Sequence, residues 1–180
     1  VPLCGENRVL VHYGLRRFSH TIMPGISALL DVTGVSGRNI TASEIGFVLA
    51  PRINSAGRIG ETTDALQLLL TEDPSEARSL AEKLDTTNQA RKIEDERTLD
   101  EALEILERNY DLDHDRGIVL ACDGWHPGVI GIVATRLVER TQRPVLMIAL
   151  DGERGRGSGR SIPGFNLFEA LEECSEHLLR

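Results

Sequence analysis

Three patterns that would each point to a familiar class of protein are missing from this sequence. No apolar run approaches the roughly 20 residues that a membrane-spanning helix needs. The first residues, VPLCGENRVLVHYG, lack the charged start and apolar block of a secretory signal. The three cysteines lie far apart and none forms a C-x-x-C pair, which disfavours a zinc site or a disulfide framework. We therefore expect a cytoplasmic protein with reduced thiols and no membrane contact.

Groups that commonly perform chemistry are scattered along the chain. The five histidines lie far apart, and no nucleophile–base pair stands out. The one string that resembles a metal site, DLDHD at 111–115, lies between an expected helix and an expected strand, so we interpret it as an acidic loop. The sequence therefore predicts no catalytic residue and no metal ligand, but a protein equipped to bind something anionic.

Charge is unevenly distributed. The net charge of −8 at first argues against a nucleic-acid partner. However, residues 72–115 hold 15 acidic and 6 basic side chains, a net of −9, so the rest of the chain sums to about +1. Of the 20 basic residues all but two are arginine, which suits bidentate recognition of phosphate. A local basic surface outside the acidic segment is therefore expected.

Helical periodicity dominates the first part of the chain. NRVLVHYGLRRF and GISALLDVTGV each carry apolar residues at helical spacing, with Gly34 and Gly37 as stop signals. The segment APRINSAGRIG, with its glycines and arginines, predicts a loop, and a helix follows over about 62–70.

Residues 75–108 predict one long helix. Its apolar side would consist of Leu80, Leu84, Ile93, Leu99, Leu103 and Leu106. The polar middle, DTTNQARKIEDER, favours a connector between two lobes over a single shared core. The alternative is a solvated surface helix.

The pattern changes near residue 116. The apolar runs GIVLACD and RPVLMIALD predict two buried strands, and HPGVIGIVATRLVERTQ between them predicts a helix. This order predicts a βαβ unit with parallel strands. A Gly-rich stretch follows, and NLFEALEEC begins a last helix whose N-cap is Asn166. The predicted fold class is α/β.

The strand-to-helix turn at 123–128 is the first candidate site. Pro127 is well placed as the first helical residue, and the free N–H groups at a helix start favour an anion. His126 could donate to a phosphate oxygen, and Trp125 could stack on a base or pack in the core. The alternative is an ordinary tight turn with a core tryptophan and a capping histidine.

Two arginine-bearing segments could act with this turn. In GERGRGSGRS, 152–161, Arg154, Arg156 and Arg160 alternate with glycines, and serines add small donors, which suits a phosphate. A flexible basic hairpin tip is the alternative. APRINSAGRIG, 50–60, sets arginines among small and apolar residues. There the alternative is a turn whose arginines pair with local carboxylates.

Taken together, LAPRINSAGRIG, GWHPGVIGIVATRLVE and GSGRSIPGFNLFEAL resemble the RecJ family of DHH phosphoesterases, and they occur in that family's order. A linking helix of the family's type, NQARKIEDERTLDEA, lies between them. The resemblance covers essentially the whole chain. It implies an internal segment of a two-metal exonuclease that degrades single-stranded DNA in the 5′→3′ direction, in DNA repair and recombination.

The resemblance implies a division into three parts: residues 1–72 as the end of a DHH domain, 73–115 as connector helix and acidic loop, and 116–180 as an incomplete DHHA1 substrate-binding domain. It places the ligands of the two Mn²⁺ or Mg²⁺ ions outside this chain, before Val1, and a Gly-Gly-His segment beyond Arg180. The chain by itself should be inactive. Single-stranded DNA is the expected partner, with a single-strand-binding protein or helicase as further partners of the family.

Seven positions match the family's substrate-binding motifs: Arg52, Asn54, Arg58, His126, Ser158, Arg160 and Ser161. The resemblance implies that Ser158, Arg160 and Ser161 hold the 5′-terminal phosphate. An arginine facing the same phosphate is either Arg52 or Arg58, and the choice stays open. Two other functions also stay open: a phosphodiesterase of short oligonucleotides or cyclic dinucleotides, and a non-catalytic nucleic-acid-binding scaffold.

Overall fold

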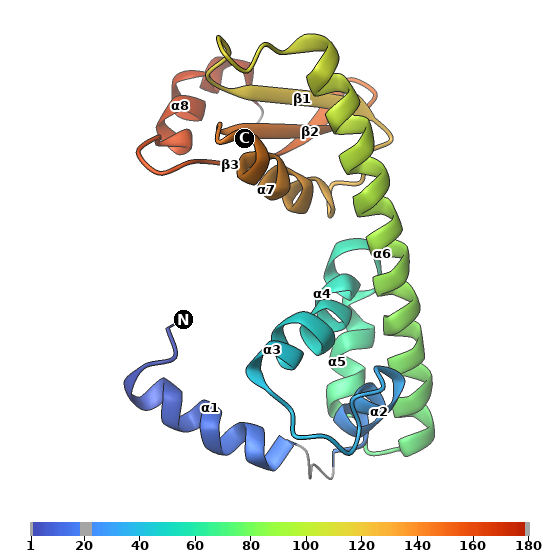
Figure 1. Ribbon diagram of the computed structural model, residues 1–180. Coiled ribbons are helices and arrows are strands. Elements are labelled where there is room, and N and C mark those ends of the chain that lie inside the picture. The colour runs from blue at the N-terminus through green and yellow to red at the C-terminus, as the bar shows by residue number, and fades with distance from the viewer. Residues whose placement is uncertain (1, 19–22, 179–180) are drawn as a thin grey trace. The chain divides into compact units, whose positions relative to one another are not determined.

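The computed structural model describes residues 2–18 and 23–178. Its chain divides into two compact units, residues 1–91 and 92–180, and helix α6 (Pro74–Asn109) contributes to both (Figure 1). The described part of the chain contains no helix both long and apolar enough to cross a bilayer. The long helix predicted over 75–108 is confirmed, and the α/β class is confirmed by helices combined with a three-stranded sheet.

The first unit is helical. It contains α1 (Gly5–Phe18), α2 (Pro24–Val32), α3 (Ala42–Glu44), the π-helix η1 (Ile45–Leu49), α4 (Ala50–Ile59), α5 (Thr62–Leu70) and the start of α6. The two helices predicted near the N-terminus are confirmed. Gly34 follows the end of α2 with a φ of +70°, a left-handed conformation that glycine adopts without strain. Gly34 therefore follows the end of α2 as predicted, because its positive φ does not continue the helix.

The prediction of a loop at 50–60 is wrong. These residues form α4, which continues α3 and η1 without a break. Small residues there serve close packing rather than turning, since Ser55 and Ala56 have no exposed surface. Gly60 ends the helix, and a Cβ at Gly60 would lie 2.9 Å from Thr87 Cγ2 of α6. Gly60, one of the glycines that suggested a loop, therefore lets the end of the helix approach α6.

The core of the first unit packs α2, α4, α5 and the beginning of α6 together. Leu29 and Leu68 are fully buried, as are the alanines of α6 at 77 and 81. The contact between α2 and α5 is so close that a Cβ at Gly25 would lie 1.6 Å from the Leu68 carbonyl oxygen. This core fixes the position of α4, which carries the arginine-bearing motif.

The second unit is a sheet with helices. It contains the rest of α6, β1 (Ile118–Asp123), α7 (Ile130–Thr141), β2 (Val145–Asp151), β3 (Arg154–Arg160), α8 (Leu167–Glu173) and the 3₁₀ helix η2 (Ser175–His177). The strand order is β1-β2-β3, with β1 and β2 parallel and β3 antiparallel to β2. The predicted βαβ unit is confirmed. The Gly-rich stretch, whose alternative reading was a flexible hairpin tip, forms strand β3.

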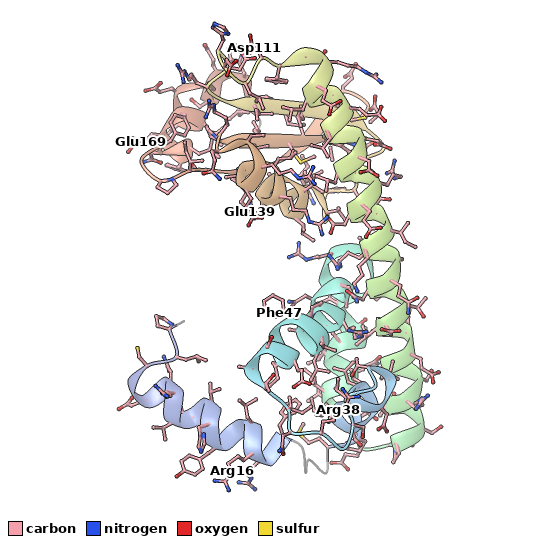
Figure 2. All side chains as sticks on the ribbon, in the orientation of Figure 1. Arg16, Arg38, Phe47, Asp111, Glu139 and Glu169 are labelled. Carbon is pink, nitrogen blue, oxygen red and sulfur yellow. The ribbon has the colours of Figure 1, made fainter. Side chains whose placement is uncertain are left out.

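Helix α7 covers one face of this sheet. On the face covered by α7, Ile118 and Leu120 of β1 and Val145 and Met147 of β2 are buried. The outer surface of α7 carries the exposed Glu139, and that of α8 the exposed Glu169 (Figure 2). The Asn166 side chain caps α8 by accepting a hydrogen bond from the Glu169 N–H, as predicted.

Two details of the helices differ from the sequence-based expectation. Ile93, placed on the apolar side of α6, is 69% exposed, whereas the polar Asn88, Asp95 and Thr98 are buried. The helix buries polar side chains here because some of them have partners, such as Arg136 of α7, whose guanidinium lies 3.3 Å from Asp95. Helix α7 begins at Ile130, three residues later than the proline expected to open it.

Candidate functional site

Ser158 and Arg160 form the centre of the candidate site. They are two residues apart on β3, so both side chains point to the face that α7 covers. Arg160 Nη1 donates to Ser158 Oγ at 3.3 Å and to the Gly159 carbonyl oxygen at 2.7 Å. Ser158 is half-buried and Arg160 is exposed, so the guanidinium is held in place while it stays accessible.

Helix α7 completes this cluster with a glycine and a threonine. Arg160 Nε donates to Thr135 Oγ1 at 3.2 Å, and Thr135 Oγ1 donates to the Gly131 carbonyl oxygen at 3.1 Å. A Cβ at Gly131 would lie 2.8 Å from Ser158 Oγ and 3.0 Å from Arg160 Nη2. Gly131 therefore leaves the room that the two polar side chains occupy. We call Gly131, Thr135, Ser158 and Arg160 the β3–α7 cluster.

The cluster suits an oxyanion. A serine hydroxyl and a fork-shaped guanidinium can donate together to one phosphate, and such charge-assisted hydrogen bonds are among the stronger ones in proteins. The guanidinium is already oriented by its bonds to Thr135, Ser158 and Gly159, so little conformational freedom remains to be lost on binding.

Sequence reasoning missed Gly131 and Thr135. Their spacing of four residues places them on one side of a helix, but nothing in the sequence says that this side faces β3. The small residue and the hydroxyl acquire their role only through the packing of α7 on the strand.

Ser161 lies just beyond β3 and has a local partner. Its hydroxyl donates to the Phe165 carbonyl oxygen at 2.7 Å, which closes the loop before α8. Its part in binding phosphate stays a prediction.

His126 lies in the turn between β1 and α7. Its Nδ1 accepts a hydrogen bond from the Gly128 N–H at 3.0 Å, so the proton of the neutral ring sits on Nε2. Its carbonyl oxygen accepts from the Val129 N–H and the Ile130 N–H. The sequence predicted free N–H groups at the start of this helix. That prediction is wrong for Gly128, Val129 and Ile130, because their N–H groups all donate to His126. What His126 can offer a ligand is Nε2–H.

Trp125 packs in the core. The side chain is 3% exposed, and Nε1 donates to Glu101 Oε2 of α6 at 2.8 Å. Of the two alternatives left open by the sequence, burial in the core is the one observed, since an indole with this little exposed surface offers no free face to a base.

A hollow of about 800 Å³ lies at the carboxyl ends of β1 and β2. Open sheets with parallel strands commonly bind ligands at this edge. The hollow is lined by Glu94 and Arg97 of α6, by residues 124–127, by residues 149–151 and by Arg154, Gly155 and Arg156 of β3. It therefore gathers basic side chains from two parts of the second unit.

In the first unit, Arg52 and Arg58 differ in their surroundings. Arg52 Nε lies 2.7 Å from Asp85 Oδ1, and its Nη1 donates to the Val48 carbonyl oxygen at 2.6 Å, which leaves the side chain 17% exposed. Arg58 and Asn54 are exposed. Arg52 thus pairs with a local carboxylate, and Arg58 is the more exposed of the two arginines.

The helical turn just before α4 exposes an aromatic ring. Phe47 of η1 is 82% exposed and points away from the helices beside it (Figure 2).

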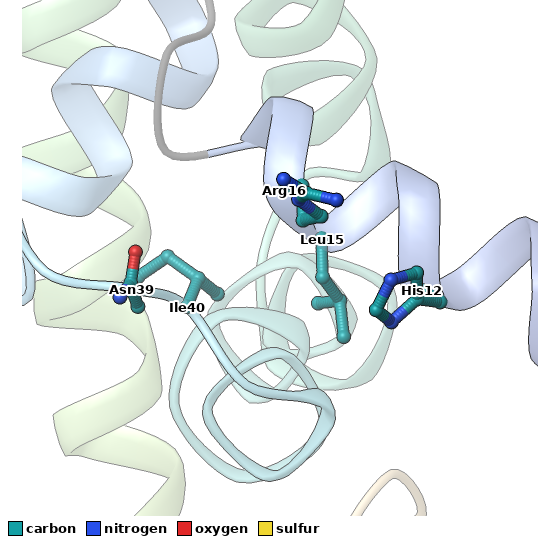
Figure 3. A pocket seen from close by; sticks show the side chains of 5 residues that line it. All are labelled: His12, Leu15, Arg16, Asn39 and Ile40. Atoms are coloured by element: carbon teal, nitrogen blue, oxygen red, sulfur yellow. The ribbon is translucent and has the colours of Figure 1, made fainter.

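A smaller hollow of about 450 Å³ lies elsewhere in this unit, lined by His12, Leu15 and Arg16 of α1 and by Asn39 and Ile40 (Figure 3). None of the residues matched to substrate-binding motifs lines it.

Within residues 2–18 and 23–178, no three His, Cys, Asp or Glu side chains are grouped so that they could hold a metal ion. The acidic string at 111–115 has internal partners instead. His114 Nδ1 lies 2.8 Å from Asp111 Oδ2, and the Asp111 N–H donates to Asp115 at 2.7 Å. The string is an acidic loop between α6 and β1, as the sequence predicted.

Comparison with known proteins finds a matching domain model for part of the chain and relatives that are similar along its whole length. A family model described as the DHHA1 domain matches residues 114–178, which include β1, α7, β2, β3 and α8. The chain is 43% identical over 180 residues to the single-stranded-DNA-specific exonuclease RecJ of Bacillus subtilis, covering 99% of this chain and 23% of that protein. The chain is RecJ-like along its whole length.

Other RecJ proteins agree. RecJ of Escherichia coli is 40% identical over 179 residues, covering 96% of this chain and 30% of the relative. The crystal structure of Thermus thermophilus RecJ in complex with Mg²⁺ superimposes with a TM-score of 0.87 at 39% identity, over 100% of this chain and 27% of that one. The chain thus spans 23% to 30% of the length of these curated relatives. The resemblance to RecJ and the α/β fold are confirmed.

Proposed function

We propose that this chain is the substrate-holding part of a metal-dependent exonuclease that degrades single-stranded DNA from its 5′ end. The observation that supports this most directly is the β3–α7 cluster: an oriented arginine and a serine, packed on a helix of the DHHA1 domain in a RecJ-like chain. The 5′-terminal phosphate is the anion that this cluster would hold.

The residues have separate roles in this proposal. Ser158 Oγ and the Arg160 guanidinium donate to the terminal phosphate, with Ser161 at its side. His126 offers Nε2–H near the strand. Arg58 with Asn54 serves as the polar contact of the first unit, because both are exposed whereas the Arg52 side chain is only 17% exposed. Holding the end of the strand at a fixed place determines which phosphodiester bond is presented for cleavage.

Chemistry would come from two divalent metal ions held by residues outside this chain. RecJ structures have been solved with Mg²⁺ and with Mn²⁺, and such ions activate a water for attack on a phosphodiester. The division into 1–72, 73–115 and 116–180 belongs to this proposal, as do a cytoplasmic location and contacts with a single-strand-binding protein or helicase. The division and these partners rest on the family resemblance, and the location rests on the number and spacing of the cysteines.

The test is the preference of the full-length enzyme for a phosphorylated end. Cleavage of 5′-phosphorylated and 5′-hydroxyl single strands is compared for the wild type, Arg160→Ala and the matched control Arg140→Ala, which removes the same charge from the exposed end of α7. We expect the preference to fall at least tenfold in Arg160→Ala and to persist in the control. An unchanged preference in Arg160→Ala would contradict the role of the cluster.

Substrate length separates this proposal from the small-substrate alternative. An exonuclease that holds a strand should turn over long single strands better than dinucleotides or cyclic dinucleotides. The reverse ranking would favour a phosphodiesterase of small substrates, and binding without cleavage in the presence of Mn²⁺ would favour a scaffold.

A further inference from the structure

Two residues of helix α6 hold the turn that carries His126. Trp125 Nε1 donates to Glu101 Oε2 at 2.8 Å, and Arg97 Nη2 donates to the Gly124 carbonyl oxygen at 3.0 Å. Arg97 Nη1 also donates to Glu101 Oε1 at 2.7 Å, so the arginine and the glutamate hold each other. These hydrogen bonds form a closed ring between α6 and two consecutive residues of the turn. We call Arg97 and Glu101 the α6 clamp.

The hydrogen bonds of Arg97 leave it little to offer a ligand. Its Nε donates to Glu94 Oε2 at 3.2 Å and its Nη2 to Glu94 Oε1 at 2.6 Å, in addition to the bonds described above. Most of the N–H groups of the guanidinium are therefore engaged, and two carboxylates neutralise its charge. Although Arg97 lines the hollow at the carboxyl ends of β1 and β2, its contacts belong to the turn and to its own helix.

His126 is fixed from both sides. The residues before it are the two that the α6 clamp holds, and Gly124 has a φ of +82°, which a residue with a side chain rarely adopts. On the other side, the Gly128 N–H donates to His126 Nδ1 and orients the half-buried ring. The direction in which Nε2–H points is therefore set partly by α6, through two residues that lie more than 20 positions earlier in the chain.

The ion pair of the clamp contributes little to the stability of the fold. The Arg97 and Glu101 side chains are 44% and 38% exposed, and pairs with this much solvent contact add little to the free energy of unfolding. Glu104 and Arg108 form another exposed pair on the same helix. What distinguishes the clamp is its hydrogen bonds to the turn, so its main effect is on the geometry of the turn.

We propose that Glu101 and Arg97 are positioning residues for substrate binding. They hold the turn at 123–128 so that His126 presents Nε2–H to a phosphate oxygen of the single strand. This inference rests on the proposed function, because it takes His126 as a contact to the DNA. Neither residue of the clamp touches the DNA itself. Both act through His126, and that dependence can be measured.

A double-mutant cycle in the full-length protein tests this dependence. Affinity for a 5′-phosphorylated single strand is measured by fluorescence anisotropy with EDTA present, so that cleavage does not interfere. H126A should weaken binding about tenfold, since a hydrogen bond to a charged group has this order of magnitude. E101A should weaken it about fivefold in the wild-type background but less than about twofold in the H126A background, because residues that act through one contact are not additive.

Three further variants separate positioning from a general loss of structure. E101Q keeps a side-chain oxygen that can accept from the Trp125 indole and should retain most of the affinity. R97A removes the hydrogen bond to Gly124 and should repeat the result of E101A, including its dependence on His126. E104A is the matched control, because it removes the same charge from the exposed pair with Arg108, and it should bind like the wild type.

Each outcome supports or refutes the clamp. Wild-type affinity in both E101A and R97A would refute it, and so would an equal loss with and without His126, since the two residues would then act elsewhere. Wild-type affinity in H126A would remove the contact that the clamp is inferred to position. The proposed function fails by a different result, an unchanged preference for a phosphorylated end in Arg160→Ala.

Discussion

Substitution of Gly131 by alanine should damage phosphate recognition while it leaves the fold intact. The added Cβ would lie 2.8 Å from Ser158 Oγ and 3.0 Å from Arg160 Nη2, so both atoms must retreat by roughly half an ångström to reach ordinary contact distances. Both atoms lie at the far ends of side chains that can rotate, so the free energy of unfolding should change little. Alanine also has the higher helix propensity, by about 0.5–1 kcal/mol, which offsets the strain.

The functional loss should be larger. Displacing the hydroxyl and the guanidinium removes one or more charge-assisted hydrogen bonds to the terminal phosphate, each contributing about 1.5–3 kcal/mol. Since about 1.4 kcal/mol corresponds to a factor of ten, the preference for a 5′-phosphorylated end should fall on the order of 10-fold to 100-fold. The assay is the ratio of kcat/KM for 5′-phosphorylated and 5′-hydroxyl single strands in the full-length enzyme, together with the melting temperature.

Gly46→Ala is the matched control, because Gly46 is also helical and a Cβ there meets nothing within 4 Å. It should leave the preference at the wild-type value and the melting temperature unchanged or slightly raised, since alanine has the higher helix propensity. The reasoning is refuted if Gly131→Ala keeps the full preference for a phosphorylated end. It is equally refuted if Gly131→Ala lowers the melting temperature by as much as a core truncation does, since the strain would then reach the packing.

Three further predictions concern single contacts. Thr135→Val removes the acceptor of Arg160 Nε and should weaken the 5′-phosphate preference about fivefold, whereas Thr135→Ser should retain it in the same kinetic assay. Asp95→Asn replaces the buried carboxylate that pairs with Arg136 and should lower the free energy of unfolding by about 2 kcal/mol in urea denaturation; no change would contradict the pairing. Burial, reinforced by nearby carboxylates, raises the pKa of the Cys122 thiol, so at pH 8 iodoacetamide should label it more slowly than the two exposed cysteines, as mass spectrometry can measure.

The elements that were predictable share one property: their periodicity is written in local sequence. Long helical spacing over 75–108 and continuous apolar strands around a helix led directly to α6 and to the parallel β1–β2 pair. The motifs at 50–60, 123–128 and 152–161 identified the resemblance to RecJ. The arginines and Ser158 of β3 were predicted to bind phosphate from residue type alone.

Other features depended on packing. The glycines and arginines of 50–60 suggested a loop, but burial of Ser55 and Ala56 stabilises a helix there. Pro127 suggested the start of a helix, but His126 satisfies the N–H groups of the turn and moves the start to Ile130. Local propensity cannot register such contacts, because their partners lie elsewhere in the chain or in the turn geometry.

The sequence by itself determined the class of the protein, most of its helices and strands, and the side chains suited to an oxyanion, since these follow from residue chemistry and short-range spacing. Only the tertiary structure decided which of those side chains act together. Strand β3 lies antiparallel beside β2 and under α7, so Ser158 and Arg160 meet Gly131 and Thr135, whereas Trp125 is buried against α6 and Arg52 is engaged by Asp85. Hydrogen bonds and close contacts between segments distant in sequence made this selection, and no local pattern encodes them.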